Sequence, residues 1–69
     1  MKLKINGELQ EIDASEILLK DLLNNLDISP ESKGIAVAVN DTLILRTEWH
    51  TLILVENDAV EIVTARQGG

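Results

Sequence analysis

A single stretch of this chain has the apolar spacing of an amphipathic helix, which limits the fold to strands arranged around one helix. Four leucines recur at the i, i+3, i+4 and i+7 positions of one helical face: Leu19, Leu22, Leu23 and Leu26. We expect this helix to begin between Glu16 and Leu19, after an N-cap at Asp13 or Ser15. Pro30 prevents the helix from continuing.

The segment before the helix predicts a β-hairpin. Residues 2–5 alternate charged and apolar side chains, as a half-buried strand does. Asn6-Gly7 is the dipeptide most typical of a tight hairpin turn. Residues 8–12 then form the second strand, and a bulge or a longer turn would explain why Leu9 and Ile12 differ in parity.

The segment after the helix predicts further strands. Residues 35–39 are apolar at every position, 43–45 form a short strand, 52–54 allow another short pairing, and 59–64 form the last strand. Residues 46–51 are irregular with a possible helical turn, in which Trp49 is expected in the core and His50 on the surface. The predicted class is α+β, with a mixed four- to five-stranded sheet packed on one main helix.

Composition excludes several classes of function. The 69 residues suffice for one small domain, and with no cysteine and a single histidine the usual zinc-ligand and triad patterns fail. The net charge of −6 argues against binding to nucleic acid or an anionic membrane surface, and suits a basic protein partner. No signal peptide or membrane-spanning run is visible, so a cytoplasmic location is expected.

The end of the sequence is the candidate reactive part. We expect a folded domain over residues 1–64 and a flexible tail over 65–69 that ends in Gly68-Gly69. Five residues at up to ~3.3–3.6 Å each reach about 17 Å, far enough to enter a neighbouring active site. A diglycine has no side chains to block a narrow channel, although a frayed end would have the same composition.

The whole chain resembles the ThiS family of sulfur carriers from thiamine biosynthesis, which have a ubiquitin-like β-grasp fold. The resemblance is carried by Asn6-Gly7, Asp21-Leu22-Leu23, Ala36-Val37-Ala38-Val39-Asn40, Arg46-x-x-Trp49, Asp58-x-Val60-Glu61-Ile62-Val63 and Gly68-Gly69. Gln67 stands where many relatives have a third glycine or small residue, which shortens the threading element. Molybdopterin-synthase small subunits and ubiquitin-like modifiers are similar more loosely, through the fold and the diglycine.

The resemblance implies a sulfur carrier that is a protein cosubstrate and not an enzyme. An E1-like adenylating enzyme would use ATP and magnesium to activate the Gly69 carboxylate, and this chain would bind no cofactor itself. A persulfide donor would convert the adenylate to a thiocarboxylate, which a thiazole synthase would use. Gln67, Gly68 and Gly69 would thread into the partner's active site. A carrier for molybdopterin or cysteine synthesis and a ubiquitin-like modifier stay open as alternatives.

A docking surface is predicted on the sheet face that the helix leaves open. Val63 points away from Val60 and Ile62 by strand alternation, and Ala36 and Ala38 point away from the larger side chains of their own strand. An apolar open face suits a transient partner, and Glu61 would orient that partner by its charge. Cover by the chain's own loops is the alternative.

Overall fold

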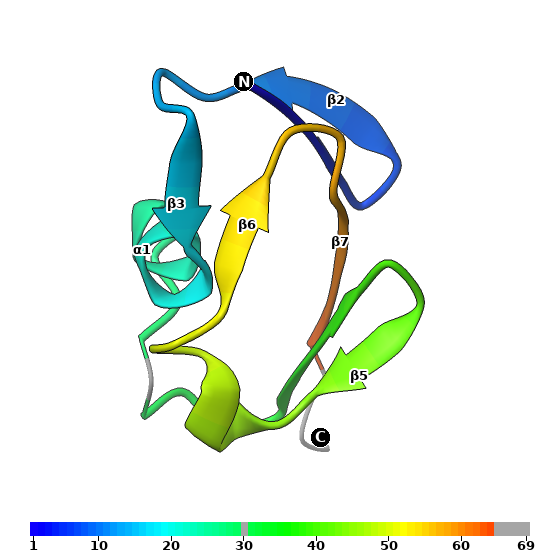
Figure 1. The fold of residues 1–69 in the computed structure, drawn as a ribbon. Helices are drawn as coiled ribbons and strands as arrows, with labels where there is room; N and C mark the ends of the chain where they lie inside the picture. Colours follow the sequence, from blue (N-terminus) through cyan, green and yellow to red (C-terminus); the bar gives the residue numbers. More distant parts are fainter. Residues whose placement is uncertain (30, 65–69) are drawn as a thin grey trace.

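The computed structural model describes residues 1–29 and 31–64, and its main element is a five-stranded mixed sheet (Figure 1). The strand order is β2-β1-β7-β4-β5. The strands are β1 (Lys2–Ile5), β2 (Glu8–Glu11), β4 (Ile35–Val39), β5 (Thr42–Ile44) and β7 (Ala59–Thr64). β1 and β7 are parallel, and the other neighbouring pairs are antiparallel. The predicted mixed sheet with one main helix is confirmed.

The first hairpin turns as Asn-Gly predicts. Asn6 and Gly7 have φ of 50° and 86°, the left-handed pair of values that a type I′ turn needs. The ladder runs in regular register from Lys2 opposite Glu11 to Ile5 opposite Glu8, so both the bulge and the longer turn are wrong. Leu9 differs in parity from Ile12 because it lies on the sheet face away from the core, where its side chain is 67% exposed.

Helix α1 (Leu19–Asn25) is shorter than the predicted segment, and neither expected N-cap is used. Leu18 is the N-cap and makes no side-chain capping bond. Instead, the carbonyl of Leu52 accepts from the Leu19 amide at 2.9 Å, and the carbonyl of Trp49 accepts from the Lys20 amide at 2.8 Å. Backbone groups from another loop therefore satisfy the helix start.

The C-terminal end of α1 has the hydrogen bonds of a Schellman motif. The Ile28 amide donates to the Leu23 carbonyl at 2.9 Å, and the Asp27 amide donates to the Asn24 carbonyl at 3.0 Å. Asp27 takes the left-handed conformation at φ 64° that this motif requires. Leu26 is the C-cap and is 37% exposed, so the buried apolar stripe ends at Leu23 and not at Leu26 as predicted.

A second, two-stranded sheet lies beside the helix. β3 (Glu16–Leu18) pairs antiparallel with β6 (Ile53–Val55), from Glu16 opposite Val55 to Leu18 opposite Ile53. The sequence allows a short pairing at residues 52–54, and the paired strand is Ile53–Val55; its partner lies where the sequence predicts the start of the helix. Ile17 and Leu18 extend into a strand because β6 supplies the backbone partners that an isolated segment lacks.

Figure 1 shows α1 beside β3, with β7 on the other side of the molecule. One largely aliphatic core joins α1 to the large sheet. Its buried members are Leu3, Ile5, Leu19, Leu22, Leu23, Val37, Val39, Trp49, Leu54 and Val60. Trp49 is 3% exposed, and the Arg46 guanidinium carbon lies 4.4 Å from the centre of its ring. Arg46 opens the 3₁₀ turn η1 (Arg46–Glu48), and His50 is exposed as predicted.

No helix within residues 1–29 and 31–64 is long and apolar enough to span a membrane.

Candidate functional site

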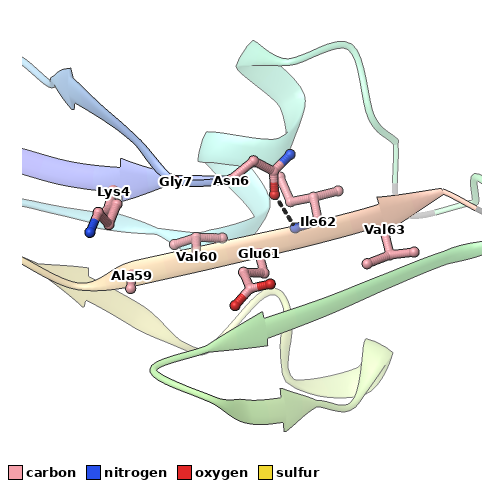
Figure 2. A pocket seen from close by; sticks show the side chains of 8 residues that line it. All are labelled: Lys4, Asn6, Gly7, Ala59, Val60, Glu61, Ile62 and Val63. Atoms are coloured by element: carbon pink, nitrogen blue, oxygen red, sulfur yellow. Dashed lines mark hydrogen bonds between the residues drawn. The ribbon is translucent and has the colours of Figure 1, made fainter.

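The site is built on β7, whose two faces have different environments. Val60 is 1% exposed and Ile62 half-buried, and both point toward the core. Glu61 and Val63 point to the other side of the strand, as Figure 2 shows, and Val63 is 61% exposed. Alternation along one strand therefore places a charged and an apolar side chain side by side in solvent.

β4 completes this surface, because its register with β7 brings the four predicted docking residues together. Ala36 is directly opposite Val63, and Ala38 is directly opposite Glu61. Ala36 is exposed and Ala38 is half-buried. No loop of the described chain covers these positions completely, which favours an open face over the alternative of loop cover. Their docking role stays a prediction.

One residue of this surface was missed by the sequence reading. Leu43 of β5 is directly opposite Ala38, so its side chain lies on the same face, and it is 66% exposed. The sequence predicts a short strand at residues 43–45 without assigning Leu43 to a face. Only the pairing with Ala38 identifies its face. We use "open face" for Ala36, Ala38, Leu43, Glu61 and Val63.

A groove of about 620 Å³ adjoins the open face where β1 ends against β7 (Figure 2). Lys4 and Glu61 bring one charge of each sign to this groove, and Ala59 and Val63 bring apolar surface. The Asn6-Gly7 turn forms its end. The groove can therefore take a polar segment of a partner beside the apolar contact.

A hydrogen bond closes the groove at the turn. The Ile62 backbone amide donates to Asn6 Oδ1 at 2.7 Å, across 56 positions of sequence (Figure 2). Sequence reasoning assigned Asn6 to the turn alone. No local signal could have found this contact, because it depends on the parallel pairing of β1 with β7.

The predicted reactive end lies beyond this site along the chain. Gln67, Gly68 and Gly69 are outside the described residues, as is the whole predicted tail at 65–69. The described part of β7 ends at Thr64, opposite Ile35 at the edge of the open face. Part of the open face therefore lies on the strand whose last described residue, Thr64, precedes the predicted tail in the sequence.

Within residues 1–29 and 31–64, no three His, Cys, Asp or Glu side chains gather in a way that could hold a metal ion.

The mixed sheet, its single main helix and its open face define the class of ubiquitin-like β-grasp domains. Two solved structures of this class, both from Geobacter metallireducens, are similar over the whole chain. A crystal structure of the thiamine biosynthesis protein ThiS matches with a TM-score of 0.84 and 26% identity, covering 100% of both chains. A solution NMR structure of a thiamine biosynthesis protein matches with a TM-score of 0.81 and 26% identity, covering 100% of this chain and 88% of the other.

The chain belongs to the ThiS family, whose model matches residues 3–69. Sequence relatives include the uncharacterized protein ycf40 of Porphyra purpurea, 39% identical over all of this chain and 93% of the relative. The ycf40 protein of Pyropia yezoensis is 36% identical with the same coverage. The recognition made from the sequence motifs is confirmed.

Proposed function

We propose that this protein is a sulfur carrier of thiamine biosynthesis, whose reactive group is the Gly69 carboxylate in the form of the chain that ends there. The observation that carries the proposal is the family match over residues 3–69, which includes the open face and both final glycines. The thiamine biosynthesis protein of G. metallireducens, which shares the fold over its full length, supports the pathway.

The first chemical step activates a poor electrophile. A Gly69 carboxylate oxygen attacks the α-phosphorus of ATP in the active site of an E1-like partner, forming an acyl-adenylate and releasing pyrophosphate. Magnesium held by the partner neutralises the phosphate charge. The adenylate turns the carboxylate into an acyl group with a good leaving group.

The second step loads the sulfur. The terminal sulfur of a persulfide on a donor protein attacks the Gly69 carbonyl carbon and expels AMP, giving an acyl disulfide. A thiol then cleaves the sulfur–sulfur bond, which leaves a thiocarboxylate on Gly69 and a disulfide between thiol and donor. A thiazole synthase would take its ring sulfur from this group. The carrier acts as a cosubstrate, since its partners supply the acid, base and metal.

The open face gives this chemistry a docking surface. Val63 and Leu43 are 61% and 66% exposed on strands that flank Ala36 and Ala38, so an apolar contact is available without unfolding. Glu61 is directly opposite Ala38 on the same face and matches a basic partner, as does the net charge of −6. Docking through this face holds Thr64 close to the partner's entrance.

The test is to incubate the chain with ATP, magnesium, the adenylating enzyme of its organism and a persulfide donor, then record its intact mass. A gain equal to replacing one oxygen by sulfur, absent without ATP, is the expected result. A variant that ends at Gly68 should fold normally and gain nothing. Loading that survives this deletion would overturn the assignment to Gly69.

The same loaded protein separates the alternative pathways. Addition of thiazole synthase and its other substrates should discharge the sulfur into a thiazole. Discharge only by a molybdopterin synthase or a cysteine-forming enzyme would move the protein to one of those pathways. Attachment of Gly69 to lysines of other proteins would make it a modifier.

A further inference from the structure

The hydrogen-bond pattern of β7 changes where β1 stops. Asp58 and Val60 accept from β1 through their carbonyls, from the Lys4 amide at 3.0 Å and the Asn6 amide at 2.9 Å. Val60 is the last residue of β7 with a backbone partner in β1, and the chain then turns away at Asn6-Gly7. The next rung of the ladder is the Ile62 amide.

The side chain of Asn6 supplies the acceptor that β1 no longer provides. Its Oδ1 accepts from the Ile62 amide at 2.7 Å, where the next acceptor of a longer β1 would stand. On its other edge β7 is paired with β4 as far as Thr64. Asn6 therefore holds one edge of β7 as far as Ile62, two residues before Thr64, while β4 holds the other edge.

We infer that Asn6 is a positioning residue for the reaction at Gly69. Its bond to Ile62 restrains β7 two residues before Thr64, the last described residue on the way to Gly69. This inference rests on the proposed sulfur-carrier function. It predicts an effect on turnover by the adenylating enzyme with little change in KM, because Asn6 is outside the open face and its Oδ1, at the end of the groove, is already bonded to the Ile62 amide.

The residue type at this position has to meet two demands. A φ of 50° is a left-handed conformation that most side chains disfavour and that Asn, Asp and Gly adopt. The bond to Ile62 also needs a short side chain with an acceptor oxygen. Asn and Asp meet both demands, whereas Gly meets only the first. The variants Asn6→Gly and Asn6→Asp therefore separate the turn from the bond.

A matched control lies at the other end of β7. Asn57 has φ 70° in the turn before β7, and no hydrogen bond of its side chain is found in the described part of the chain. Asn57→Gly makes the same substitution in a left-handed turn without removing a bond to β7. Any general effect of glycine on the unfolded chain is shared by the two variants.

The experiment measures adenylation kinetics with each full-length variant as the substrate, and amide hydrogen exchange of each variant alone. For Asn6→Gly we expect kcat to fall roughly three- to tenfold with KM within about twofold, and Ile62 exchange to rise roughly tenfold. Asn6→Asp should restore both values, and Asn57→Gly should resemble the wild type.

Three results would overturn the inference. One is wild-type kcat for Asn6→Gly despite faster Ile62 exchange. Another is a rise in KM with unchanged kcat, which would make Asn6 a docking residue. The third is unchanged Ile62 exchange, which refutes the restraint of Ile62 by Asn6 even if the wild-type chain proves not to be a substrate. A wild-type chain that is not a substrate contradicts the proposed function, and the exchange measurement still tests the bond.

Discussion

The two faces of the large sheet differ in the exposure of their side chains, although the same strands form both faces. On the helix side, Leu3, Val37 and Val60 are at most 1% exposed. On the open side, Leu43 and Val63 are more than 60% exposed although they are equally apolar. Val60 and Val63 even belong to the same strand. A side chain's role in this molecule therefore depends on the face that its position selects.

Under the proposed function, folding and recognition are assigned to separate residues. Substitutions on the helix side should lower the free energy of unfolding, and those on the open face should weaken partner binding with little effect on stability. A chain of 69 residues has few positions to spare for both tasks. Strand alternation allows β4 and β7 to serve both at once.

The largest expected effect is on stability from the helix side. Leu3→Ala should lower the free energy of unfolding by about 2–5 kcal/mol, because it leaves a cavity at a fully buried site. Leu43→Ala, the matched truncation on the open face, should change it by less than about 0.5 kcal/mol. Urea titrations followed by circular dichroism measure both. Equal losses would abolish the distinction between the faces.

The next effect is on recognition from the open face. Val63→Lys should raise the KM of the chain as a substrate of the adenylating enzyme roughly tenfold, by placing a cation in an apolar contact with a basic partner. Val55→Lys is the control, because Val55 is also a strand valine, 47% exposed, but lies on β6. Equal changes in KM for the two variants would move the docking surface away from the open face.

The smallest effect concerns charge. Glu61→Lys should lower kcat/KM about two- to fivefold at low ionic strength, and the loss should shrink above roughly 0.5 M salt, where charges on the surface are screened. Glu31→Lys changes the same charge in the loop before β4 and should have less effect. A salt-independent loss for Glu61→Lys would point to a steric cause instead.

Much of this arrangement could be predicted from the sequence because it depends on local patterns. Alternation identified the inward Val60 and the outward Val63, and Asn6-Gly7 identified the first turn with its left-handed geometry. The run at residues 35–39 also indicated a strand with larger side chains on one face and smaller side chains on the other. Period-two patterns need no knowledge of a partner strand.

The features that were not predicted depend on contacts between distant residues. Glu16–Leu18 forms a strand only because β6 pairs with it, and by itself the segment has an apolar pattern that also fits a helix. The acceptors for the first amides of α1 are the carbonyls of Leu52 and Trp49, which no local capping rule includes. The bond from Ile62 to Asn6 likewise requires the folded sheet.

The most direct test of the sulfur-carrier account is fragmentation mass spectrometry of this protein purified from cells that are making thiamine. The account predicts a fraction of chains with one sulfur in place of one oxygen, and fragments that place this sulfur on Gly69. A sulfur located on any other residue, or chains joined through Gly69 to lysines with no thiocarboxylate present, would contradict it.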